Sequence, residues 1–348
     1  MLISLCFVLL TFSLPGYNHY IIYYRRDEIR QFRHLTVKTT YLQINPIKPR
    51  RLQVMKITFD TSAFWETGMS YEEIYHTVAE AGYEYISPYD PTFPGFWKRP
   101  KATNEEVMWH KKAIDKCGLK IASLTTGFRL ADPDEFMRRY AVDCWKRMIE
   151  IGEMMDVKIF NTELGGDISQ PELCEAKLMR SLDELIPIFE SKSMRLDIQA
   201  HPNDFYETSK DACDIVKYYD SPAFGYLYSI PHTFHYDGGK GDVASMLKYA
   251  GKALKHIIVA DTWDYTKLFR YNVNPAPLYA SGQVRCHAHI GKIGQGDIDF
   301  DTCFQTLREM GFGEQEDTIA TFNPLGFPER AVEDGKYTKE RLEKELLS

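Results

Sequence analysis

The chain has 348 residues, enough for two average domains or for one large α/β barrel of about 250 residues. Apolar residues make up 44% and charged residues 26% of the sequence, so intrinsic disorder is not expected. Residues 1–54 contain eight Lys and Arg against two Asp and Glu, so the remainder carries a net charge of −13 within a total of −7. An acidic body lacks the basic face that a phosphate backbone requires, which excludes nucleic acid as the main partner.

The N-terminal segment differs in character from the rest. Residues 1–16 contain an apolar run that is too short to span a bilayer and lacks the preceding positive charges of a secretion signal, so no membrane association is expected. Residues 17–54 are aromatic and basic, without a sustained helical or strand period. We predict that residues 1–54 are an extension outside the functional protein, which starts at Met55; a secretion signal and a structured extension are the alternatives.

From Met55 onward, strand-like segments alternate with helical patterns. The predicted strands are residues 56–60, 83–87, 119–124, 157–161, 195–200, 224–228, 256–260 and 317–321. Helix-start signals lie at Ser70, Asn104, Asp132, Ser169 and Asp299. Strict alternation implies parallel strands, and eight units favour a closed (β/α)₈ TIM barrel of class α/β, as a single domain over residues 55–348. Neither a GxGxxG motif after the first strand nor a P-loop is present.

Polar residues collect directly after several predicted strands. Glu163 follows the fourth strand, His201 the fifth and His232 the sixth, and His289 precedes the last helix-start signal. The carboxyl ends of barrel strands meet at one mouth, so these side chains should converge. One carboxylate and three imidazoles suit Mn²⁺, Co²⁺, Fe²⁺ or Zn²⁺. We therefore predict one divalent metal site, with the choice among these four ions left open by the donor types.

Two of these ligand choices have a close competitor. His235 competes with His232, which lies nearer to its strand, and His287 competes with His289, which points to the opposite side if the segment is extended. His201 precedes a proline, so its structural alternative is to order the turn.

Further titratable residues have weaker signals. Asp261 and Asp264 follow the seventh strand, where either could act as a base or orient a metal-bound imidazole, with a turn or cap as the structural alternative. His256 begins its strand, at the end away from the site, and is expected to be structural. His76 and His110 lie within helices and are expected at the surface.

The cysteines carry information about the compartment. There are seven, an odd number, and none forms a CxxC pair. This pattern indicates reduced thiols, and we therefore predict a cytoplasmic protein.

Three segments resemble the xylose-isomerase-like barrel superfamily of sugar phosphate isomerases and epimerases. They are residues 256–262 (HIIVADT), residues 289–300 (HIGKIGQGDIDF) and residues 198–204 (IQAHPND). The resemblance covers nearly the whole chain after Met55, and it implies a divalent metal and a sugar substrate.

The chain departs from that family at the metal site. Epimerases of the family bind metal through a Glu, an Asp, a His and a second Glu, and the two Glu move the proton. Those places hold Gln199, Ser229, Ile258 and Thr321 or a neighbour of Thr321. The chain therefore looks more like 3-keto-glycoside epimerases and the large subunits of C-glycoside deglycosidases. The latter resemblance implies Mn²⁺, a small β-rich partner subunit and hence an oligomer.

The function expected from this resemblance is a metal-dependent carbon–carbon lyase that acts on 3-oxo-C-glycosides. Its base would be His201 or Asp261. Enolisation of the 3-keto sugar would be followed by β-elimination of the aglycone. The alternative is a metal-dependent isomerase or epimerase of a keto-sugar or keto-glycoside. A non-catalytic barrel and a DNA-repair endonuclease are minor alternatives, the second because the body of the chain is acidic.

Overall fold

The computed structural model describes residues 55–64, 67–89, 102–201, 204–236 (without the side chains of 235 and 236), 242–263 and 289–348, and two short strands near the N-terminus. The chain divides into two units, Met1–Arg51 and Leu52–Ser348. In the first unit, β1 (Phe7–Leu10) pairs antiparallel with β2 (Ile22–Arg25). The prediction that residues 1–54 lie outside the functional protein stays a prediction.

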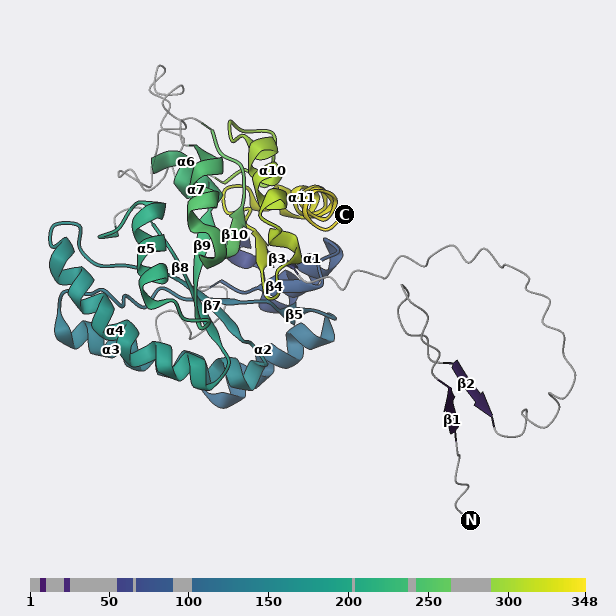
Figure 1. Cartoon of the computed structure of the whole chain (residues 1–348), viewed down its shortest axis with the longest axis horizontal. Helices are drawn as coiled ribbons and strands as arrows, with labels where there is room; N and C mark the ends of the chain where they lie inside the picture. The colour runs from purple at the N-terminus through teal and green to yellow at the C-terminus, as the bar shows by residue number, and fades with distance from the viewer. Residues whose placement is uncertain are drawn as a thin grey trace, which may run out of the picture. The chain divides into compact units, whose positions relative to one another are not determined.

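The second unit contains a sheet of nine parallel strands among its described residues, in the order β5-β4-β3-β11-β10-β9-β8-β7-β6. Their bounds are β3 Lys56–Asp60, β4 Tyr85–Ser87, β5 Lys120–Ile121, β6 Leu124–Thr125, β7 Ile159–Glu163, β8 Arg195–Gln199, β9 Phe224–Ser229, β10 Leu254–Val259 and β11 Ile319–Phe322. β5 and β6 are two pieces of one predicted strand, yet they stand at opposite ends of this order. A parallel bridge between Tyr89 and Thr125 also joins the two edges. The sheet thus closes into the predicted TIM barrel (Figure 1).

Helices follow the strands and cover the outside of the barrel (Figure 1). Their bounds are α1 Tyr71–Glu80, α2 Asn104–Lys116, α3 Glu135–Met155, α4 Pro171–Ser191, α5 Ser209–Tyr219, α6 Ile230–Tyr236, α7 Val243–Ala250, α10 Phe300–Glu309 and α11 Ala331–Leu346, with short 3₁₀ helices at Thr61–Phe64, Gly251–Ala253, Phe312–Glu314 and Pro328–Arg330. No helix in the described parts of the chain is long and apolar enough to cross a membrane.

Helix starts follow local capping chemistry. Ser70 caps α1 through a complete capping box with Glu73, as predicted, and Asp299 caps α10. Two starts differ from the prediction. α3 is capped by Asp134, because Asp132 instead accepts a bond from the backbone N–H of Asp134. α4 has no side-chain cap, since the Ser169 hydroxyl donates to Asp167.

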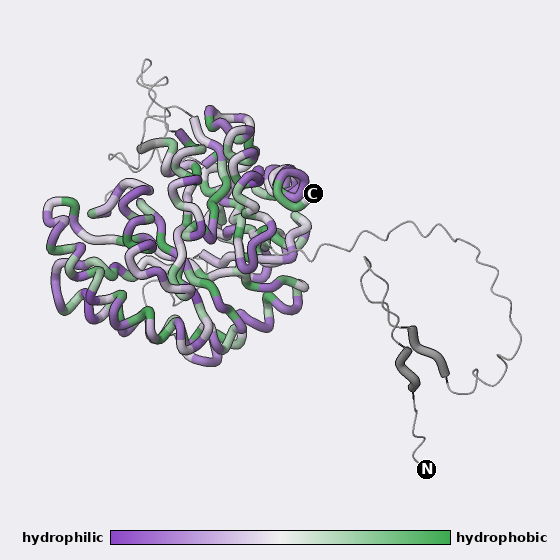
Figure 2. Tube along the Cα trace, in the orientation of Figure 1, coloured by the Kyte–Doolittle hydropathy of each residue, from purple (hydrophilic) through white to green (hydrophobic). Residues whose placement is uncertain are grey.

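Alternate residues of each strand face either the helices or the barrel interior. On the helix side, Phe160 of β7 packs edge-on against Trp145 of α3 and Phe189 of α4. All three rings are fully buried. Apolar and polar residues alternate along the surrounding helices (Figure 2), which is the pattern that buries one helix face against a barrel.

The barrel interior is partly polar. Arg195 and Asp197 of β8 form an ion pair, with Arg195 Nε 2.7 Å from Asp197 Oδ1. His256 Nδ1 lies 3.7 Å from Asp197 Oδ2, and His256 Nε2 lies 2.6 Å from Thr321 Oγ1. Gly225 leaves the room that this pair needs, since a Cβ there would stand 2.1 Å from Asp197 Oδ1. These contacts support a structural role for His256.

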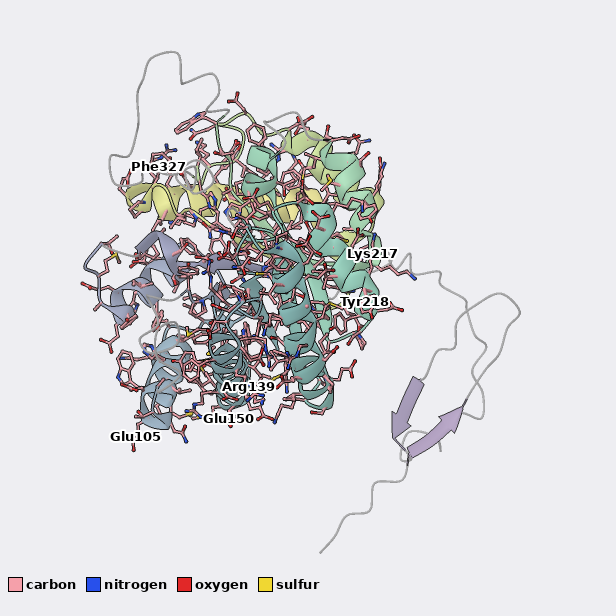
Figure 3. The ribbon with its side chains drawn as sticks, turned by 90° about the vertical axis from the view of Figure 1, so that its left-hand side faces the viewer. Glu105, Arg139, Glu150, Lys217, Tyr218 and Phe327 are labelled. Carbon is pink, nitrogen blue, oxygen red and sulfur yellow. The ribbon has the colours of Figure 1, made fainter. Side chains whose placement is uncertain are left out.

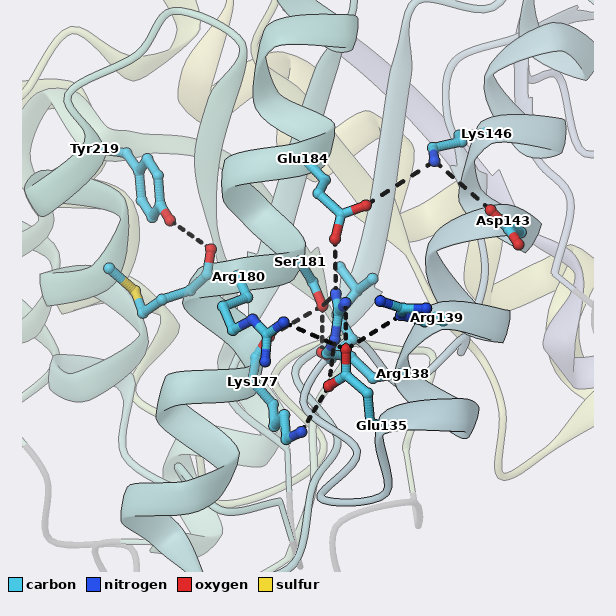
Figure 4. A network of polar contacts seen from close by, with 12 residues as sticks. Glu135, Arg138, Arg139, Asp143, Lys146, Lys177, Arg180, Ser181, Glu184 and Tyr219 are labelled. Atoms are coloured by element: carbon cyan, nitrogen blue, oxygen red, sulfur yellow. Dashed lines mark hydrogen bonds and ion pairs between the residues drawn. The ribbon is translucent and has the colours of Figure 1, made fainter.

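A second buried charge joins α3 to α4. Arg138 is 1% exposed and donates to Ser181 and Glu184 of α4, each at 3.1 Å, and to Glu135 of its own helix. Lys177 also binds Glu135 (Figure 4). The guanidinium is thus shared between acceptors on two helices, as a buried charge requires. Charged residues such as Glu105, Arg139 and Glu150 lie exposed on the outer helices (Figure 3).

The surface position expected for His110 is wrong. The side chain is only 2% exposed, and its Nδ1 lies 2.8 Å from the hydroxyl of Tyr75 on α1. Burial lowers the pKa of His110 to about 4, against a smaller opposing effect of Glu106. His76, by contrast, is exposed as expected. The five cysteines that the structure describes are free thiols.

We expect His110 to make the protein sensitive to acid. Its pKa is about 4 in the folded state, against about 6.5 unfolded, so between these values the unfolded chain binds the proton that the native chain rejects. Stability should therefore fall as the pH drops below 6.5, and this contribution should stop growing below 4. When the pH is lowered from 7 to 5, the free energy of unfolding measured with urea should decrease by about 1–2 kcal/mol less in His110→Gln than in the wild type. Equal losses in the two proteins would contradict this account.

Candidate functional site

The site lies at the carboxyl ends of four neighbouring strands, where the parallel sheet brings them together. Glu163 is the last residue of β7 and pairs in register with Gln199, the last of β8. His201 follows two residues later. β9 runs directly into α6, whose third residue is His232. His289 precedes Ile290, which bridges to Asp261 just after β10.

Glu163, His201, His232 and His289 form a continuous row. His201 Nε2 lies 3.3 Å from Glu163 Oε1. The rings of His201 and His232 meet edge-on with centroids 5.0 Å apart, and those of His232 and His289 are 5.4 Å apart. The three imidazoles are buried, whereas 31% of the Glu163 side chain is exposed. The structure thus brings together the four residues predicted as metal ligands.

The competing histidines are not described to the same degree. The side chain of His235 and the whole of His287 lie outside the described residues, as does Asp264. The choices of His232 over His235 and of His289 over His287 therefore stay predictions, although both chosen residues belong to the row.

His289 is oriented from behind by two residues that the sequence did not single out. Its Nδ1 lies 2.8 Å from Asn323 Oδ1. An amide oxygen only accepts, so Nδ1 carries the proton and Nε2 keeps its lone pair, as a metal-binding imidazole requires. The Asn323 side chain also bonds to Asp60 at the end of β3. Burial raises the pKa of Asp60 to about 6, although hydrogen bonds from Ser62 and Asn323 oppose the shift.

Asp204 is a further acidic group on this rim, and it too was not predicted. Its Oδ2 accepts a 2.8 Å bond from the backbone N–H of Gly165, which ties the segment after β8 to the turn after β7. That turn needs glycine, because Gly165 has a φ of +71°. Burial raises the pKa of Asp204 to about 7, and the charge of Glu163 adds to the rise, while His201 opposes it. The strand-end rule that identified His201 applies equally to Asp204.

Asp261 holds a loop. Its Oδ2 accepts from the N–H groups of Gly294 and Gly296, each at 2.7 Å, and its Oδ1 accepts from Thr262 at 2.8 Å and from Ile298 at 3.3 Å. The side chain is fully buried. Burial raises its pKa, while the four backbone N–H groups oppose the rise. Four donors occupy both oxygens, so the geometry favours loop anchoring over the proton transfer predicted for Asp261. The anchored loop carries His289.

The residues at the family's usual ligand places are neutral, as the sequence indicated. Gln199 and Ser229 end β8 and β9, and both are buried. Ile258 is a buried residue of β10, and the hydroxyl of Thr321 is engaged by His256. None of them supplies a carboxylate to the rim.

The row fits a divalent ion by its donor types and by its position on one rim. As the side chains stand, however, no three His, Cys, Asp or Glu residues in the described part of the chain surround a common point. Glu163 instead contacts His201. Ligation therefore requires side chains of the row to rotate from the positions that they have here.

Comparisons with known proteins identify the family and the relatives of this chain. The family described as "Xylose isomerase-like TIM barrel" matches residues 75–339. The inosose isomerase of Bacillus licheniformis is 23% identical over 218 residues, which cover 60% of this chain and 69% of that protein. The structure of 3-keto-D-glucoside 4-epimerase from E. coli has a TM-score of 0.61 at 15% identity, covering 82% of this chain and 99% of that one. The IOLI protein, solved with a zinc atom, has a TM-score of 0.62 at 20% identity, covering 84% and 99%.

We expect Asn323→Ala to weaken metal binding. Without the amide oxygen, His289 can rotate or take the other tautomer, and loss of such an outer partner costs about 10–100-fold in metal affinity. The affinity can be measured from free Mn²⁺ by electron paramagnetic resonance. The control is Asn104→Ala, an exposed asparagine on α2, which should bind Mn²⁺ like the wild type. Unchanged affinity in Asn323→Ala would show that His289 does not depend on this bond.

Asp261→Asn should destabilise the protein strongly. The new amide would turn an N–H₂ group towards backbone N–H donors, leaving buried donors unpaired at about 1–3 kcal/mol each. We expect a loss of roughly 2–4 kcal/mol in urea unfolding at pH 7. Asp301→Asn, whose side chain is 89% exposed, should change stability by less than about 0.5 kcal/mol. A mild effect of Asp261→Asn would contradict the anchoring role.

Proposed function

The chain belongs to the xylose isomerase-like TIM barrel family, and we propose that it uses this fold for metal-dependent removal of the proton next to the carbonyl group of a keto-sugar. The observation that carries the proposal is the row of Glu163 and three histidines at the strand ends. Proton donors and acceptors also stand beside this row. In such barrels, that rim is where chemistry takes place.

The four residues of the row would hold the ion. Mn²⁺ is our first choice, and Co²⁺, Fe²⁺ or Zn²⁺ are the alternatives; the zinc atom in the IOLI structure supports a divalent ion in this fold. When bound, the ion would supply positive charge beside the carbonyl oxygen, which makes the neighbouring C–H more acidic. Asn323 and the loop anchored by Asp261 keep His289 in place for this purpose.

The finer proposal is a carbon–carbon lyase that acts on 3-oxo-C-glycosides. For this step His201 would leave the ion and take the proton from C2, while Glu163, His232 and His289 would still hold the ion. The electron pair left at C2 forms the C1–C2 double bond as the bond from C1 to the aglycone breaks. The aglycone carbon then receives a proton from the protonated imidazole of His201. The products are a 3-oxo sugar with a C1–C2 double bond and the free aglycone, so atoms and electrons balance.

Two features support elimination. The family's second Glu is replaced by a neutral residue, so proton return from the opposite face has no evident donor there. The resemblance to C-glycoside deglycosidases also implies the reaction, and with it a small β-rich partner subunit. The oligomeric assembly and the cytoplasmic location belong to the same proposal.

The second candidate is isomerisation or epimerisation of a keto-sugar or keto-cyclitol. The match to inosose isomerase and the fold shared with 3-keto-D-glucoside 4-epimerase favour it. Asp204 adds an acidic group beside Glu163 and His201, which could return a proton to another carbon. Both candidates share the first step at the same residues.

The lyase and the isomerase candidates can be distinguished by one experiment. The full chain is incubated with Mn²⁺ and a 3-oxo-C-glucoside in D₂O, with and without a candidate small subunit. For the lyase, we expect free aglycone by mass spectrometry. His201→Ala and His232→Ala should slow its release about 10²–10⁴-fold. His76→Ala, an exposed histidine on α1, should have no effect.

Deuterium uptake at C2 without aglycone release would favour the isomerase candidate instead. Neither exchange nor release, in protein shown to hold metal, would refute the keto-sugar proposal.

A further inference from the structure

Two buried polar side chains at the strand ends each have an oxygen without a hydrogen-bond partner among the residues that the structure describes. Gln199 is 5% exposed and Ser229 is 3% exposed. Neither Gln199 Oε1 nor Ser229 Oγ has a partner. Buried polar atoms are nearly always paired, because an unmade bond costs about 1–3 kcal/mol. The two residues end neighbouring strands, so they form one feature of the barrel.

Strand alternation directs Gln199 into the barrel. It shares its face of β8 with Asp197, which forms the interior ion pair with Arg195 and faces His256. The intervening residues Leu196 and Ile198 belong instead to the core packed under the helices.

Ser229 points the same way. Gly225 lies directly against the Asp197 carboxylate, so every second residue after it on β9 faces the interior, ending with Ser229. Tyr226 and Tyr228, on the alternate positions, lie in the helix-side core.

Both side chains therefore face the barrel interior at the carboxyl ends of their strands, close in sequence to the proposed ligands. Gln199 is the register partner of Glu163 and stands two residues before His201. Ser229 stands three residues before His232. One layer deeper, the polar side chains of β8, β10 and β11 are already engaged with one another.

The unpaired oxygens of Gln199 and Ser229 indicate which chemical groups a ligand would present to them. An amide oxygen accepts, and a hydroxyl both donates and accepts. Neighbouring hydroxyl groups on a ring satisfy both, because each can donate to one residue while accepting from another. In the orientation that the Gln199 amide has here, a carboxylate or phosphate oxygen would face the Gln199 oxygen with no hydrogen to offer.

We propose that Gln199 and Ser229 bind two hydroxyl groups of an uncharged polyhydroxylated ring, a sugar or cyclitol, and so select the substrate. This deepens the proposed function, since it rests on catalysis at the same rim. It also gives a role to the two neutral residues that occupy ligand places of the family's epimerases.

The test measures binding of unreactive rings to the full chain, with and without Mn²⁺, so that it does not depend on turnover. The probes are 1,5-anhydro-D-glucitol and myo-inositol at millimolar concentration, titrated by saturation-transfer NMR. Tetrahydropyran-2-methanol has the ring without the ring hydroxyls and should bind far more weakly. Gln199→Met and Ser229→Ala should each raise the Kd of the polyols about five- to tenfold.

Thermal unfolding of the same variants separates binding from structure. Removing an unpaired buried oxygen should leave the Tm of the unliganded protein unchanged or raise it. Thr321→Val, which removes a hydroxyl that does have a partner, should lower the Tm and leave the Kd of the polyols unchanged.

Wild-type affinity in both variants, or a lower Tm in either, would overturn the assignment, as would failure of both polyols to bind the wild type. Failure of the keto-sugar reaction is a separate result. If no exchange occurs in D₂O but polyol binding depends on Gln199 and Ser229, the hydroxyl site stands and only the reaction is wrong.

Discussion

Closure of the parallel sheet is the constraint on which the rest of this structure depends. One segment, residues 120–125, pairs with β4 at its start and with β7 at its end, so the barrel has no free edge there. Because every strand runs the same way, their carboxyl ends meet on one rim. Residues as distant in the sequence as Glu163 and His289 are thereby brought into one row. No local interaction could assemble that row, whose members come from separate strand ends.

The rim is supported from below and from behind by polar contacts within the protein. The ion pair of β8 and the bond between His256 and Thr321 fill the barrel interior. Asp261 fixes the loop that carries His289, and Asn323 fixes the tautomer of that histidine. A site that must bind an ion and a small ring with defined geometry needs such support, since a loosely held ligand loses affinity and rate.

The fold is shared with enzymes of different reactions, so it limits the chemistry without naming it. Solved structures of sugar epimerases have this barrel, among them that of 3-keto-D-glucoside 4-epimerase. We propose that the neutral Gln199 and Ser229 distinguish this chain from the epimerases of its family. The side chains of these two residues can form hydrogen bonds and carry no charge for binding an ion. In our proposal they therefore determine which hydroxyl groups of the substrate are recognised.

The sequence by itself determined the eight strand–helix units, with strand ends within about two residues of those observed, and the rim residues Glu163, His201, His232 and His289. It could do so because hydropathy period and capping are local signals and barrel strands end on one rim. Only the tertiary structure decided which neighbours each group meets. Asp261 accepts from the N–H groups of Gly294 and Gly296, more than thirty residues later, so this predicted base also anchors a loop. His110 is buried because α1 brings Tyr75 against it. Asp60 and Asn323 are separated by nearly the whole sequence of the barrel, yet their side chains form a hydrogen bond. They can do so because the first and last strands become adjacent once the sheet has closed.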